Sequence, residues 1–65
     1  MSNTEDLRDR LAGIAEELAD VAIDKLKLAA RGDEDAGRDE RKITRARKAV
    51  EKAVTLLGGD EDFDI

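Results

Sequence analysis

Residues 7–28 read LRDRLAGIAEELADVAIDKLKL, and the apolar side chains in this stretch decide the fold. They recur at alternating steps of four and three residues, which is the heptad pattern of a coiled-coil helix that packs against another helix. We call this set the first seam; it consists of Leu7, Leu11, Ile14, Leu18, Val21 and Leu28, with Lys25 at its one polar position.

Signals for the end of this helix follow directly. Arg31 places a cation in the last turn, and Gly32 is the residue type that most often ends a helix. The sequence therefore predicts a helix over residues 4–31. The turn after it is acidic, and either Asp33 or Asp35 is available to cap the next helix.

A second helix is predicted over residues 37–57. Its apolar side chains form a second seam with the same heptad spacing, which consists of Ile43, Ala46, Val50, Ala53 and Leu57. With a turn centred near Glu34, the two seams would face each other.

This pairing would place Leu11 opposite Leu57 and Leu18 opposite Val50. The predicted fold is therefore all-α, an antiparallel two-helix hairpin over residues 1–58. Residues 59–65 are predicted to form an acidic C-terminal tail.

The chain is short for an independently stable fold. A chain of 65 residues buries a small share of its surface, and cysteines, whose disulfides could stabilise the fold, are absent. We therefore expect the hairpin to need a partner. The first interpretation is a homodimer in which two hairpins form a four-helix bundle, and another protein partner is the alternative.

A further apolar stripe lies beside the first seam. It consists of Ala19, Ile23, Leu26 and Ala30. If the second helix already covers Leu18, Val21 and Leu28, it cannot cover this stripe as well, so the stripe is the predicted protein interface. Small residues at Ala15, Ala22 and Ala29 would let a neighbouring helix approach closely.

The second helix also carries a basic stripe in a chain whose net charge is -5. Its members are Arg38, Arg41, Arg45, Lys48 and Lys52. They share one helix face, from which they could follow a phosphate backbone. The alternative is an ordinary solvated helix face, which we favour because no aromatic residue lies among them to stack on bases.

The tail GDEDFDI places Phe63 and Ile65 among acidic residues. It resembles the acidic, hydrophobic-ended tips through which bacterial single-stranded DNA-binding proteins recruit partners, although those tips end in a proline and an aromatic residue. The resemblance implies a docking role for Phe63 and Ile65. Alternatively, Phe63 folds back over the open end of the hairpin, near Leu7 and Leu57.

Residue types that carry catalysis are scarce. Histidine and cysteine are absent, and Ser2 is the only serine. We therefore expect that the protein is not an enzyme and that it has neither a metal site nor a cofactor. No stretch is apolar enough to cross a membrane, so the expected location is cytoplasmic. The predicted function is a non-catalytic protein-interaction module, an adaptor or regulator, with nucleic-acid binding through the basic stripe as the less favoured alternative.

Overall fold

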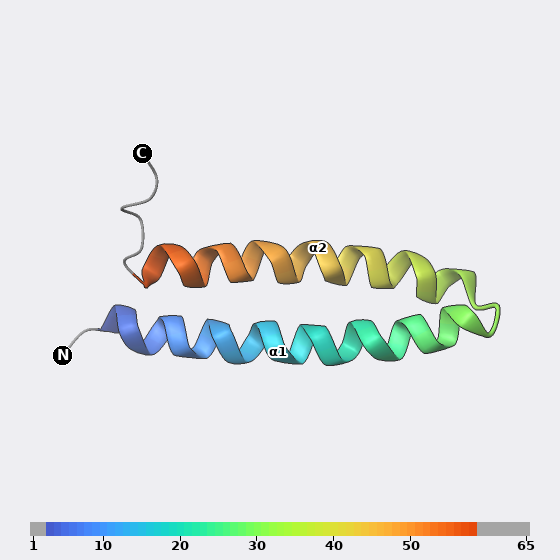
Figure 1. Cartoon of the computed structure of the whole chain (residues 1–65), viewed down its shortest axis with the longest axis horizontal. Helices are drawn as coiled ribbons and strands as arrows, with labels where there is room; N and C mark the ends of the chain where they lie inside the picture. The colour runs from blue at the N-terminus through green and yellow to red at the C-terminus, as the bar shows by residue number, and fades with distance from the viewer. Residues whose placement is uncertain (1–2, 59–65) are drawn as a thin grey trace.

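The computed structural model describes residues 3–58, which form two α-helices joined by a tight turn (Figure 1). Helix α1 spans Asn3–Ala30 and helix α2 spans Glu34–Leu57. The two helices run antiparallel, side by side along their length, so the predicted all-α hairpin is confirmed. The shortest dimension of the chain is 11 Å, about the diameter of one helix. The hairpin is therefore a slab with two broad faces.

Helix α1 ends in a glycine-dependent cap. Gly32 has a φ of 102°, a left-handed conformation that glycine adopts without steric strain. Its N–H donates to the carbonyl of Ala29 at 3.0 Å, and the N–H of Asp33 donates to the carbonyl of Leu28 at 3.2 Å. These are the two hydrogen bonds of a Schellman motif, and they confirm Gly32 as the end of the helix.

Helix α2 begins at Glu34, earlier than the predicted residue 37. The side chain of Asp33 accepts a hydrogen bond from the N–H of Ala36 at 3.0 Å, so Asp33 is the N-cap. Asp35 lies instead in the first turn of the helix, where a negative charge interacts favourably with the helix dipole. The sequence left these two caps open, and the cap that forms adds a turn to the helix.

The helices pack against each other through small residues. Within residues 3–58, the buried side chains are those of Ala15, Ala22 and Ala36. A methyl group added to Gly37 would lie 3.7 Å from the Cβ of Ala29, so the backbones are also close near the turn. The predicted close approach over the alanines of α1 is therefore present.

The first seam does not face α2 as the sequence suggested. Leu7, Ile14, Val21 and Leu28 are between 41% and 46% exposed. Each of them directly precedes a residue that faces α2, such as Ala15 or Ala22. Successive side chains point about 100° apart around a helix, so these four side chains point to the side of the contact. The expectation that α2 covers Val21 and Leu28 is therefore wrong, because the smaller alanines take the contact.

The register of the helices also differs from the predicted pairing. Lys25 Nζ lies 3.4 Å from Asp39 Oδ2, and at the other end of the hairpin Gly58 lies against Arg8. The turn centres on Gly32 and Asp33 rather than on Glu34, and this slides α2 along α1. As a result, Leu11 is nearer in level to Ala53 than to Leu57.

Candidate interaction surfaces

One broad face of the hairpin carries both seams. Lys25 belongs to the first seam by its spacing, and its ion-pair partner Asp39 precedes Ile43 and Ala46 of the second seam by four and seven residues. Heptad spacing keeps such residues on one side of a helix, so the two seams lie next to each other. We call this surface the apolar face; it consists of the first seam, the second seam, Lys25, Asp39 and Ala36, which continues the heptad row of the second seam three residues before Asp39.

The ion pair fixes which residues of the apolar face share a level. Because the helices are antiparallel, a heptad step back along α1 from Lys25 and the same step forward along α2 from Asp39 move in one direction along the hairpin. The resulting layers pair Leu28 with Ala36, Val21 with Ile43, Leu18 with Ala46, Ile14 with Val50, Leu11 with Ala53 and Leu7 with Leu57. Every layer except that of Lys25 and Asp39 is apolar.

The apolar face is incompletely covered by the hairpin itself. Leu11, Leu18, Ile43 and Val50 are half-buried, and no large apolar side chain within residues 3–58 is fully buried. Leu57 is 36% exposed at the open end. A monomeric soluble protein rarely leaves a contiguous apolar surface of this kind uncovered.

The predicted interface stripe lies on the opposite broad face. Ile23 and Leu26 are 50% and 52% exposed, Ala30 is exposed, and Ala19 is half-buried. The hollow beside Ile23 and Leu26 is walled on α2 by polar side chains, namely Glu40, Thr44 and Arg47. The structure therefore brings the stripe together at the surface, but its surroundings are polar.

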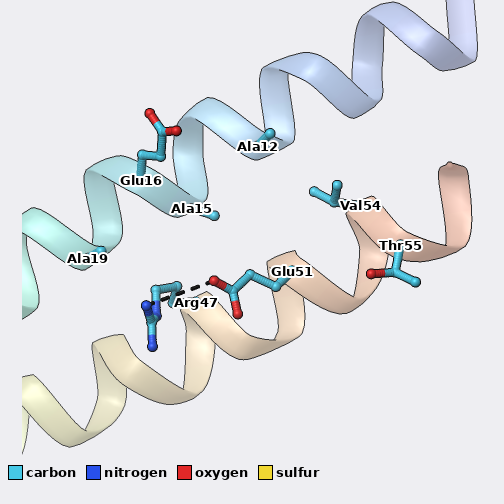
Figure 2. A pocket seen from close by; sticks show the side chains of 8 residues that line it. All are labelled: Ala12, Ala15, Glu16, Ala19, Arg47, Glu51, Val54 and Thr55. Atoms are coloured by element: carbon cyan, nitrogen blue, oxygen red, sulfur yellow. Dashed lines mark ion pairs between the residues drawn. The ribbon is translucent and has the colours of Figure 1, made fainter.

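An open groove of 390 Å³ runs between the helices on this second face (Figure 2). On the α1 side it is lined by Ala12, Ala15 and Ala19, whose short side chains leave the space. On the α2 side, Arg47 Nη1 lies 3.8 Å from Glu51 Oε2, an ion pair within one helix. Glu16, Val54 and Thr55 complete the lining, so the groove combines small apolar side chains with carboxylate, guanidinium and hydroxyl groups.

The basic stripe lies on the outer side of α2. All five of its members, Arg38, Arg41, Arg45, Lys48 and Lys52, are exposed. Arg38 pairs with Asp35 one turn earlier. The other four make no ion pair with any residue between 3 and 58. Their position facing solvent is as the sequence predicted.

Phe63 and Ile65, the predicted docking residues of the tail, lie outside the described residues. Over the part of the chain that the structure describes, no cluster of three or more potential metal ligands is found. Neither α1 nor α2 has a segment apolar enough to cross a lipid bilayer.

The apolar face contains a charged member that the sequence analysis did not single out, Asp39. Its signal was its place in the heptad row of the second seam, where a charged residue stands at an otherwise apolar spacing.

Comparisons with protein-family models, curated proteins and solved structures give no match to this chain. The surfaces of the hairpin are therefore the basis for a functional proposal.

Proposed function

We propose that the chain is a non-catalytic protein-interaction module, an adaptor or regulator that works as a homodimer assembled through the apolar face. The observation that carries this proposal is the row of Leu7, Ile14, Val21 and Leu28. These side chains remain 41–46% exposed, while the buried side chains of residues 3–58 are all alanines. A second protein surface is the simplest way to remove such a row from water.

The apolar area is sufficient to support association. Burying the exposed half of each side chain in the row contributes about 1 kcal/mol, since full burial of a large aliphatic side chain contributes about 1.5–3 kcal/mol. Two copies bring two rows, so the gain is roughly 8 kcal/mol before the second seam is counted. Association costs on the order of 4–15 kcal/mol, so the second seam is needed for a tight dimer.

The apolar face is a better homodimer surface than the predicted stripe of Ala19, Ile23, Leu26 and Ala30. It extends over both helices in successive layers, whereas the stripe occupies one half of α1 beside polar residues of α2. A partner covering the stripe would also have to desolvate Glu40 and Arg47. In this proposal the stripe stays available for a second protein.

Light scattering after size-exclusion chromatography tests the proposal. At 100 μM we expect twice the chain mass of 7.1 kDa. Ile14→Lys with Val21→Lys places two cations on the apolar face and should reduce the mass to that of one chain. Ile23→Lys with Leu26→Lys is the matched control, because it makes the same change at positions of the opposite face that are at least as exposed.

The control variant should remain dimeric. If it becomes monomeric while the Ile14 and Val21 variant remains dimeric, the predicted stripe is the interface instead. A wild-type chain that stays monomeric at 100 μM, with a melting temperature independent of concentration, contradicts the homodimer.

A second candidate function is nucleic-acid binding through the basic stripe. The observation that favours it is the row of exposed cations on α2, of which Arg41, Arg45, Lys48 and Lys52 have no ion pair within residues 3–58. A gel-shift assay at 50 mM salt, where phosphate contacts are strongest, tests it. Arg41→Glu with Lys48→Glu should abolish any shift without loss of helicity, and absence of a shift for the wild type at micromolar concentration excludes this function.

A further inference from the structure

We infer that the two hairpins of the dimer pair with their turns at the same end of the bundle, so that Lys25 and Asp39 of both copies meet in a single charged layer. This inference rests on the proposed homodimer and specifies its geometry. It follows from the position of one ion pair within the apolar face and from the charges along the edges of that face.

Two hairpins can cover each other's apolar faces in two ways. With both turns at the same end, every residue lies level with its counterpart, and α1 of one copy packs beside α2 of the other. With the turns at opposite ends, the order of layers is reversed in the second copy. The two arrangements bury the same apolar residues but bring different charges together.

The charged layer distinguishes them. The pair of Lys25 and Asp39 lies one layer away from the turn end of the apolar face, whereas Leu11 and Ala53 lie one layer away from its open end. In the opposite-end arrangement, each charged pair would therefore be enclosed against Leu11 and Ala53 of the other copy. Enclosing charges against apolar side chains is unfavourable.

In the same-end arrangement, each charge of this layer lies next to charges of opposite sign. Each Lys25 lies between Asp39 of its own hairpin and Asp39 of the other copy, so lysine and aspartate alternate around the layer. Each charge then has two partners of opposite sign in place of one. A single polar layer in an apolar core is the best-attested device for fixing register and orientation in helical bundles.

The charges at the edges of the apolar face also favour the same-end arrangement. Asp24 and Lys42 are exposed and lie on the outer borders of the face, within two residues, or about 3 Å, of the same level along the hairpin. Same-end packing therefore places Asp24 beside Lys42 of the other copy, twice in the dimer. Opposite-end packing instead brings Glu17, near the middle of α1, close to Glu17 of the other copy, which is repulsive.

Spin-label distances test the orientation. The chain has no cysteine, so Glu34→Cys introduces the only thiol, at an exposed position beside the turn. Same-end packing predicts a label-to-label distance below about 30 Å, because helices in a bundle are roughly 10 Å apart. Opposite-end packing predicts more than about 40 Å, since α1 with 28 residues is about 42 Å long.

Asp20→Cys supplies the control. Asp20 is exposed and lies near the middle of α1, so its label-to-label distance is measurable in either orientation and reports dimerisation alone. A signal from this variant with a long distance from the Glu34→Cys variant would overturn the same-end inference and leave the homodimer standing. No dipolar signal from either variant, together with a monomeric mass, would overturn the proposed function itself.

A second variant tests whether the charged layer selects the orientation. Lys25→Leu with Asp39→Ala converts the charged layer into one like the layers of Leu18 with Ala46 and Leu11 with Ala53. In this background we expect the Glu34→Cys label to give both short and long distances, because the apolar layers alone fit either orientation. A distribution that remains entirely short would show that the charged layer does not select the orientation.

Discussion

Lys25 Nζ and Asp39 Oδ2 lie 3.4 Å apart and form the ion pair that joins α1 to α2 within residues 3–58; the other ion pairs there lie within one helix. Their side chains are 32% and 46% exposed in the single hairpin. A partly exposed ion pair of this kind contributes on the order of 0.2–1 kcal/mol. Enclosure by a second copy would make the same pair more important, since the charges could no longer be solvated separately.

Charge reversal at this pair is the first prediction. Lys25→Asp alone places two carboxylates together and should lower the free energy of unfolding by about 1–3 kcal/mol, and Asp39→Lys alone should do the same with two ammonium groups. The double reversal should recover most of the loss, because it restores opposite charges. Urea unfolding at 100 μM, followed by circular dichroism, measures all three variants.

The matched control is the same exchange at Asp6 and Arg10, whose side chains are 73% and 67% exposed and 3.9 Å apart. We expect changes below about 0.5 kcal/mol there. A double reversal at Lys25 and Asp39 that is no more stable than either single variant would show that the pair does not link the helices.

The second prediction is that one substitution, glycine to alanine, has opposite effects at two positions. Gly13 lies inside α1 with no heavy atom within 4 Å of an added Cβ, so Gly13→Ala should stabilise the hairpin by about 1 kcal/mol. Gly32 has a φ of 102°, which an alanine adopts only with strain, so Gly32→Ala should destabilise it by about 1 kcal/mol. Thermal melts at a fixed concentration compare the two.

A rise in melting temperature for Gly32→Ala would contradict the left-handed turn. A fall for Gly13→Ala would mean that another molecule approaches the chain at Gly13. These two glycines therefore test both the turn and the exposed side of α1.

The third prediction concerns the N-cap of α2. Asp33→Ala removes the acceptor of the Ala36 N–H and should lower the free energy of unfolding by about 1 kcal/mol. Asp33→Asn keeps an acceptor oxygen and should cost less. Asp35→Ala is the control, because Asp35 makes no cap. It contributes a first-turn charge and an exposed pair with Arg38, so its loss should cost about 0.5 kcal/mol, less than the loss of Asp33. An equal loss for Asp33→Ala and Asp35→Ala in urea unfolding would mean that Asp33 is not the cap.

The sequence was sufficient to predict two helices and a turn between them, because those depend on local chemistry, but it did not give the residues on which the turn centres. Heptad spacing, Gly32 and the acidic turn determine two helices and their antiparallel course. The choice between Asp33 and Asp35 was left open, since both have the right chemistry, and only the position of Gly32 in the turn decides between them.

Which side of α1 meets α2 could not be predicted from hydrophobicity alone. The row of Leu7, Ile14, Val21 and Leu28 is more apolar than the row with Ala15 and Ala22, so it was expected to face α2. In the hairpin the alanines are buried instead, because small side chains allow closer backbones. The large side chains that remain at the surface are the ones that the proposed homodimer would cover.

The fourth prediction tests the alanine contact directly. Ala36 is 2% exposed and lies where the first turn of α2 meets the end of α1. A leucine there would have to push the helices apart, so Ala36→Leu should lower the free energy of unfolding by about 1–3 kcal/mol. Ala49 is exposed on the same helix, so Ala49→Leu introduces the same side chain without steric conflict and should change stability by less than about 0.5 kcal/mol.

The neighbouring Gly37 provides the opposite case at the same helix contact. A methyl group added there would lie at 3.7 Å from the Cβ of Ala29, which is ordinary van der Waals contact. Gly37→Ala should therefore stabilise α2 by roughly 0.5–1 kcal/mol through its helix propensity. Urea unfolding of the three variants gives the order Gly37→Ala, Ala49→Leu, Ala36→Leu from most to least stable. If Ala36→Leu proves as stable as Ala49→Leu, the helices are not in close contact at the turn, and the packing through alanines is wrong.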